Sequence, residues 1–103
     1  MEAIRAEALL KQLEQLVSQQ VYIHLEVNPG AYWRNGRARL TAVHVKGSGP
    51  YRIFLEMSDD SGLIQVDSLT HMQLGDGLVI ATGYDDHQRI ARTVEISTSP
   101  FSM

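Results

Sequence analysis

The chain has 103 residues, which is the size of one domain. Its 44% hydrophobic and 20% charged residues are typical of a soluble globular protein and exclude wholesale disorder. Nine Lys and Arg residues against twelve Asp and Glu residues give a net charge of −3, so we expect no function dominated by contacts to nucleic-acid backbones. The absence of cysteine excludes disulfides, thiolate zinc sites and cysteine catalysis within this chain.

The first twenty residues read as a helix and not as a targeting segment. Glu2, Glu7, Lys11 and Glu14 interrupt the apolar residues, whereas a signal peptide needs an uninterrupted apolar stretch. No part of the sequence approaches the roughly 18 consecutive apolar residues that indicate a membrane helix. We therefore expect a cytoplasmic protein that makes no membrane contact.

The spacing of apolar residues predicts one helix, over residues 2–18. The residues that form its apolar stripe are Ala6, Leu9, Leu10, Leu13, Leu16 and Val17. Such a stripe normally packs on the protein's own core, and docking against a partner helix is the alternative.

After residue 20 the period changes to two, which is typical of strands. In residues 21–27 the apolar side chains alternate with Tyr22, His24 and Glu26, so these three share one face. The predicted strands cover residues 21–27, 37–46, 51–57, 63–67, 78–84 and 89–96. Residues 69–74 are ambiguous, and residues 97–103 form a polar tail. In the second strand, Ala38, Leu40, Ala42 and His44 are expected to share one face.

The connections between these strands are too short for helical crossovers. We therefore predict a mainly β (α+β) protein: a small antiparallel, barrel-like sheet of about six strands over residues 21–96, with the N-terminal helix covering an open side. The whole chain, residues 1–103, is expected to be a single domain.

One candidate site is the pair His24 and Glu26, which point to the same face because they are two residues apart on a strand. An imidazole and a carboxylate together are ligand types for zinc or manganese. A catalytic metal site usually needs three protein ligands, so His44 or Asp67 would have to supply another. The same pair could act as acid and base, and the alternative to both is a solvated or hydrogen-bonded strand face.

A second candidate is the group of Arg34, Arg37 and Arg39 beside Tyr32 and Trp33, which we expect in a loop. Arginines near aromatic side chains can hold phosphates and bases, an acidic small molecule or an acidic protein partner. The Trp–Arg combination is also typical of interface hot spots. The alternative is a solvent-facing loop with the tryptophan anchored on the core. The acidic net charge makes nucleic acid the weaker option.

The remaining polar clusters are predicted to be turns. Asp85-Asp86-His87 falls where a hairpin turn is expected, and Asp59-Asp60-Ser61-Gly62 lacks the spaced oxygen ligands of a calcium loop. Gly47-Ser48-Gly49-Pro50 lacks the lysine and the following helix of a phosphate loop. No Gly-x-Ser-x-Gly motif occurs. We therefore predict no cofactor and favour a protein that is not an enzyme.

Several short motifs occur together in one order: VYIHLE, GAY, RNGR, GSGPYR, GLVIATGYDD and ISTSPF, which span most of residues 21–101. In this combination the chain resembles the YojF family of small uncharacterised proteins from Bacillus and its relatives. The resemblance implies no established activity and no catalytic residue. Genes of this family tend to lie beside a gene for an LmbE-like deacetylase linked to bacillithiol synthesis, which implies that enzyme as a partner.

Two functions follow as expectations. The first is a non-catalytic accessory protein that supports such a deacetylase, with Trp33, Arg34, Arg37 and Arg39 as the contact surface. Small barrels often leave edge strands exposed, which is a reason to expect association, including a homodimer. The second is a small ligand- or metal-binding barrel, or an enzyme, that uses His24, Glu26 and His44 around a pocket.

Overall fold

A computed structural model describes residues 1–102. Its elements in chain order are β1 (Glu2–Ala3), α1 (Ala6–Glu14), β2 (Gln20–Val27), β3 (Ala31–Gly47), β4 (Tyr51–Met57), the 3₁₀ turn η1 (Ser58–Asp60), β5 (Leu63–Leu69), β6 (His71–Gly75), β7 (Leu78–Tyr84) and β8 (Ile90–Ser97). The expected class, mainly β with one helix, is confirmed. No helix within residues 1–102 is long and apolar enough to cross a membrane.

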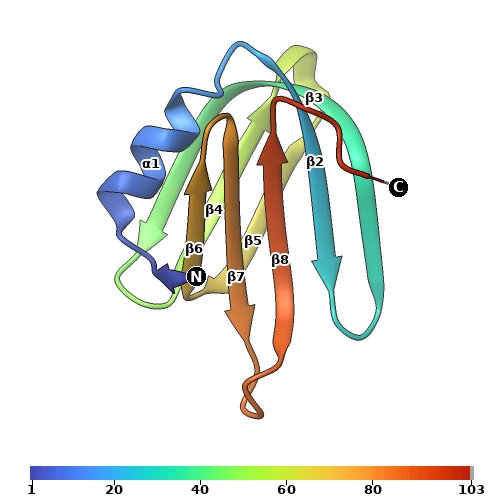
Figure 1. Cartoon of the computed structure of the whole chain (residues 1–103). Coiled ribbons are helices and arrows are strands. Elements are labelled where there is room, and N and C mark those ends of the chain that lie inside the picture. The colour runs from blue at the N-terminus through green and yellow to red at the C-terminus, as the bar shows by residue number, and fades with distance from the viewer. Residues whose placement is uncertain (103) are drawn as a thin grey trace.

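The strands form one antiparallel sheet with the order β1-β6-β7-β8-β2-β3-β4-β5. The sheet bends along β3, whose residues 31–39 pair with β2 and whose residues 40–47 pair with β4. Figure 1 shows the result: β6, β7, β8 and β2 form a front layer, and β4 and β5 cross behind it. No ladder joins β5 to β1 in the described part of the chain, so hydrogen bonds do not close the sheet into a complete barrel.

The helix is shorter than predicted, because it covers residues 6–14 and not 2–18. Residues 2 and 3 pair with β6, and the Ile4 amide donates to the Thr70 carbonyl at 3.0 Å. At the other end, Ser18 adopts a φ of 70°, and its amide donates to the Leu40 carbonyl at 3.0 Å. The apolar stripe is real: Leu9, Leu13 and Leu16 are buried, so α1 packs on the core, against β3, β6 and β7.

Where β3 leaves the front layer, a bulge between Leu40 and Ala42 reverses the alternation of its side chains. Leu40 and Val43 are therefore both buried, whereas His44 lies on the outside. The predicted common face of Ala38, Leu40, Ala42 and His44 is wrong for this reason. A one-residue insertion changes which face every later side chain occupies, and alternation alone cannot show it.

The chain also changes layer between β5 and β6. The Thr70 amide, between these strands, donates to the Thr82 carbonyl of β7 at 2.9 Å. Gly83 of β7 passes so close beneath this corner that a Cβ atom there would lie 2.1 Å from the Ser68 carbonyl oxygen. The two layers enclose a single core between them, with α1 over one open side (Figure 1).

Candidate functional site

The β2–β3 hairpin carries most of the candidate residues on the side that faces away from the core. Cross-strand pairs place Tyr22 opposite Arg37, and Glu26 opposite Tyr32. Side chains that lie directly opposite in an antiparallel pair share a face. We call this surface the hairpin face; its members are Tyr22, His24, Glu26, Tyr32, Arg34, Arg37 and Arg39.

His24 and Glu26 meet as the alternation of β2 predicts. Nε2 of His24 lies 3.1 Å from Oε1 of Glu26, and the His24 side chain is only 2% exposed. The Asn28 amide donates to Oε2 of Glu26 at 2.5 Å. This bond, with the contact to His24, lowers the pKa of Glu26 below its usual range, and the positive charge of Arg34 acts in the same direction.

A second bulge shapes this site. Ile23 pairs with Gly36 and Leu25 pairs with Trp33, so Arg34 and Asn35 both lie opposite His24. Asn35 has a φ of 58°, a conformation that asparagine tolerates better than most residues. This backbone conformation directs the Asn35 side chain toward Phe101.

The segment after β8, residues 98–102, covers His24 and is called the tail here. The Asn35 side chain accepts from the Phe101 amide at 2.7 Å and donates to the Phe101 carbonyl at 2.8 Å. The Phe101 ring lies 6.3 Å from the imidazole of His24 in an edge-on arrangement, and the Tyr32 ring lies 5.8 Å from it. The Arg34 guanidinium stacks on Phe101 at 5.7 Å from the ring centre. In Figure 1 the tail leaves β8 and crosses β2 toward β3.

One atom of this site is unsatisfied: Nδ1 of His24 is buried and has no hydrogen-bond partner. Buried polar atoms without partners are uncommon in folded proteins. If Nε2–H donates to Glu26, Nδ1 carries a free lone pair that can accept a hydrogen bond or bind a metal ion.

The aromatic–arginine group does not form the expected loop, because residues 31–47 are one continuous strand. Its side chains are also divided between the two faces. Trp33 pairs with Leu25 on the core side of the hairpin and is 45% exposed, while Tyr32 on the hairpin face is 71% exposed. The predicted joint surface of Trp33 with the arginines is therefore corrected to one of Tyr32 with the arginines.

The three arginines have different surroundings. Arg34 donates to the Ser102 carbonyl at 3.2 Å and so belongs to the tail contact. Arg39 donates to the Ser18 carbonyl and thereby ties β3 to the chain after α1. Arg37 is exposed and lines a shallow hollow of about 220 Å³ beside η1. Arg34 and Arg39 thus hold other segments of the chain in place, whereas Arg37 is available to a partner.

His44 lies apart from His24 and Glu26. Its Nε2 is 2.6 Å from Oε2 of Glu56, and both side chains are half exposed on the outside of the rear layer. The described residues contain no group of three His, Asp or Glu side chains that could hold a metal ion. The predicted convergence of His24, Glu26 and His44 is therefore wrong. Asp67 accepts from Gln65 at 2.9 Å and supplies no third ligand.

The Asp85-Asp86-His87 segment is a turn, as predicted. Oδ1 of Asp85 accepts from the amides of Arg89 and His87 at 3.0 and 2.8 Å. The Arg89 amide is the largest of the causes that lower the pKa of Asp85. This is local backbone hydrogen bonding and leaves no ligand set.

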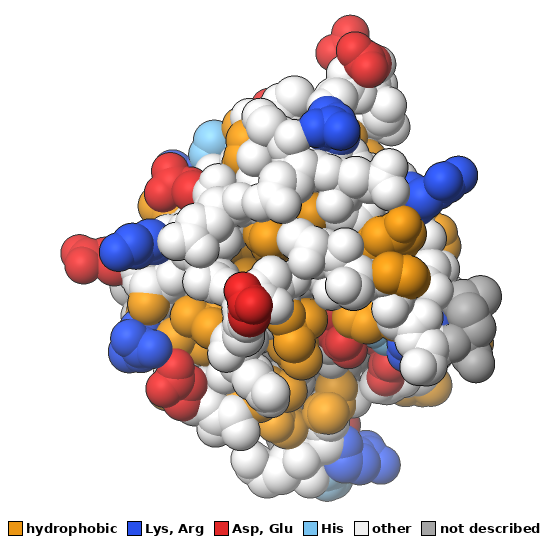
Figure 2. Space-filling view, turned by 45° about the horizontal axis from the view of Figure 1, so that its top comes forward, with side chains coloured by type: hydrophobic (Ala, Val, Ile, Leu, Met, Phe, Trp, Pro, Cys, Tyr) orange, Lys and Arg blue, Asp and Glu red, His pale blue; other side chains and the backbone are white. Residues whose placement is uncertain are grey.

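Sequence reasoning missed the tail, in which Phe101 bonds to Asn35, 66 residues earlier in the chain. The only signal is one large aromatic residue within an otherwise polar C-terminal segment. Asn28 and Asn35, which fix Glu26 and the tail, read as turn residues in the sequence. Figure 2 shows acidic and basic side chains intermingled over the face it presents, with no large patch of one sign.

Comparison with known proteins gives the family. A family model described as "Protein of unknown function (DUF1806)" matches residues 27–101. The uncharacterized protein YojF of Bacillus subtilis strain 168 is 29% identical over an alignment of 118 positions that covers 100% of both chains. The crystal structure of the B. subtilis YojF protein matches with a TM-score of 0.89 and 30% identity, covering 99% of this chain and 97% of that chain. The chain therefore belongs to the DUF1806 family and is a YojF-like protein.

Proposed function

We propose that this chain is a non-catalytic accessory protein that binds a protein partner through the hairpin face. The observation that supports this proposal is the exposure of Tyr32, which is 71% exposed on β3 and lies on the same face as Arg34 and Arg37. Tyrosine and arginine are the side chains most enriched in the energetic centres of protein interfaces, together with tryptophan. An exposed surface with tyrosine and arginine side chains suits protein binding better than catalysis.

The partner to test first is an LmbE-like deacetylase linked to bacillithiol synthesis, because the family resemblance implies it. A cytoplasmic location is part of this proposal. The experiment is co-purification of the two proteins at micromolar concentration, followed by an assay of the deacetylase with and without this chain. A stable complex or a changed deacetylase rate is the expected result. If neither occurs, the deacetylase is not the partner.

A second experiment tests the hairpin face as the contact surface. Tyr32→Ala and Arg37→Ala should each weaken the complex about tenfold or more, as hot-spot truncations do. Arg52→Ala is the matched control, because Arg52 is an exposed arginine on β4 of the rear layer. Equal losses in all three variants would overturn the hairpin face as the contact surface. Sedimentation of this chain alone distinguishes a homodimer through the same face from a hetero-complex.

A second candidate function, binding of a small ligand or metal ion at His24 and Glu26, is favoured by the buried Nδ1 atom of His24 that lacks a partner. The test is calorimetric titration with zinc and with manganese. His24→Gln should abolish any binding at this site, whereas His44→Gln removes the other histidine–glutamate pair and serves as the matched control. Heat that persists in His24→Gln would exclude the site.

A further inference from the structure

The strand β5 presents a free edge. It is the last strand of the sheet order and pairs only with β4 among the described strands. Within residues 1–102, none of the backbone hydrogen bonds outside the ladders involves residues 63–69. Natural edge strands are usually protected by lysine, proline or a covering segment. Here the far end is covered, where Ser68 crosses Gly83, and β5 also approaches β8, whereas Leu63 at the near end is 58% exposed.

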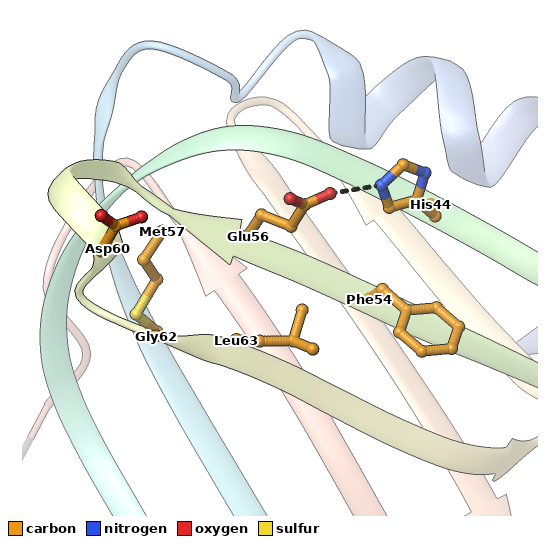
Figure 3. Close-up of a pocket in the computed structure, with 7 residues that line it drawn as sticks. All are labelled: His44, Phe54, Glu56, Met57, Asp60, Gly62 and Leu63. Atoms are coloured by element: carbon orange, nitrogen blue, oxygen red, sulfur yellow. Dashed lines mark hydrogen bonds and ion pairs between the residues drawn. The ribbon is translucent and has the colours of Figure 1, made fainter.

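A hollow of about 440 Å³ lies on the outside of the rear layer, next to the start of β5. Figure 3 shows its lining: the paired His44 and Glu56 on one side, Phe54 and Leu63 along the strands, and Asp60 at the far end. Glu56 is directly opposite Leu63 in the β4–β5 ladder. A long side chain on a strand added beside Leu63 would therefore extend over leucine toward a carboxylate.

On the other side of β5 is a cleft of about 200 Å³ between the two layers. Residues 65–67 of β5 form one wall, and residues 25–27 of β2 with residues 92–93 of β8 form the other. Leu25, Val27 and Val66 supply the apolar surface of this cleft, and Glu26, Asp67 and Arg92 are the charged residues of its lining. The free edge thus lies between an acidic, partly aromatic hollow outside and a partly apolar cleft inside.

The charges around this edge indicate which kind of segment can pair with β5. Glu56 and Asp60 line the outer hollow, and Glu26 and Asp67 line the inner cleft, where Arg92 is the one Lys or Arg residue of the two linings. The second half of the chain, residues 51–103, has eight acidic and three basic side chains. Antiparallel pairing of β5 with β5 of a second copy would bring these carboxylates together, and like charges in such proximity are unfavourable. A basic segment is complementary instead.

We propose that residues 63–66 of β5 bind an extended, basic segment of a partner protein by strand addition. Main-chain hydrogen bonds to the free edge supply affinity, and side chains of the added strand alternate between the two flanking hollows. Lysine or arginine side chains enter the outer hollow toward Glu56 and Asp60, and aliphatic side chains enter the inner cleft beside Val66.

This surface adjoins the hairpin face, because Glu26 lines the inner cleft and Met57 lines both the outer hollow and the hollow beside Arg37. Tyr32 lines neither of the two hollows beside β5, and Leu63 is not part of the hairpin face. Tyr32→Ala and Leu63→Lys therefore make the failure of each proposal separately observable.

The test uses the full chain and a fluorescently labelled peptide of about six residues in which arginine and valine alternate. Fluorescence anisotropy should show saturable binding below about 1 mM, the concentration that corresponds to about 4 kcal/mol. The same peptide with N-methyl groups on alternate residues should lose binding, because its amides can no longer donate to β5. A glutamate–valine peptide should bind at least about tenfold more weakly. Equal binding of the N-methylated peptide would overturn strand addition, and no saturable binding would overturn the proposal as a whole.

Variants locate the contact. Leu63→Lys should weaken peptide binding at least about tenfold, because it places a like charge at the free edge without disturbing the core. Gln73→Lys adds the same charge at an exposed position on β6 and is the matched control. Amide hydrogen exchange should slow at residues 63–66 when the peptide is bound. Binding that is equal in both variants, or protection confined to other strands, would show that β5 is not the docking edge.

Discussion

Gly36 shows how one residue fixes the position of the single tryptophan. The indole of Trp33 lies over the Gly36 backbone, and a Cβ atom at position 36 would be 1.9 Å from Cζ2 of the ring. No side chain fits there unless the indole leaves. The Trp33 indole can lie against the strand because residue 36 has no side chain, although the indole itself is only half buried.

Gly36→Ala should displace the indole toward solvent. Because Trp33 is the only tryptophan, the emission spectrum reports on it alone. We expect a red shift of the emission maximum and a loss of about 1–3 kcal/mol in the free energy of unfolding, the usual cost of overfilling a packed site. An unchanged spectrum at unchanged stability would show that Trp33 is not held in this way.

The Glu26 carboxylate links stability to pH. Its folded-state pKa lies below the ordinary value of 4.5, first because of the hydrogen bond from Asn28 and second because of the bond from His24. A depressed carboxylate pKa stabilises the fold above the unfolded-state pKa, and this contribution is lost as the pH falls through the folded-state pKa.

The stability difference between the native chain and Glu26→Gln should therefore be largest at neutral pH and should shrink as the pH falls below about 4.5. Urea unfolding at several pH values measures it. Glu95→Gln, on the neighbouring strand β8, provides a comparison carboxylate. A difference that grows on acidification would contradict the role of Glu26.

At the scale of elements, alternation predicted β2 well and β3 poorly. Residues 21–27 alternate without interruption, so the pairing of His24 with Glu26 followed from the sequence. In β3 the extra residues at the two bulges break the alternation, and the polar run through Arg34 and Asn35 resembles a loop. The ladder hydrogen bonds to β2 and β4 overrode that local preference. The tail contact joins Asn35 to Phe101, which are far apart in the sequence, so no local pattern predicts it.

The tail should depend on Asn35. Asn35→Gly keeps a residue that accepts positive φ and removes both side-chain bonds to Phe101. The Phe101 amide should then exchange with solvent at least about tenfold faster in hydrogen-exchange measurements, which corresponds to about 1.4 kcal/mol of local opening. Ser99→Gly, elsewhere in the tail, is the control for chain flexibility, because it leaves Asn35 and Phe101 unchanged. Equal acceleration in both variants would remove Asn35 from this role.

For the whole molecule, the decisive contact between layers is that of Gly83 with the Ser68 carbonyl. Both partners are backbone, so neither can give way as a flexible side chain would. Gly83→Ala would force the β5–β6 corner away from β7 and open the core. Gly75→Ala is the matched control, since its added Cβ atom would meet its nearest neighbour at 3.6 Å.

We expect Gly83→Ala to lower the free energy of unfolding by at least about 2 kcal/mol, and Gly75→Ala to change it by less than about 1 kcal/mol. Thermal and urea unfolding of both variants measure the difference. A Gly83→Ala variant as stable as Gly75→Ala would show that the two layers do not depend on this approach.

The place of β8 in the sheet has a consequence for biosynthesis. This strand follows all the other described strands in the chain, yet it lies between β7 and β2 and completes both ladders. Until it emerges, the nascent chain carries two unpaired edges where the middle of the finished sheet will be. Such edges are templates for wrong pairing. The sheet can therefore be completed only after β8 has been synthesised, and a stop codon ahead of residue 90 would yield two half-sheets that lack their common strand.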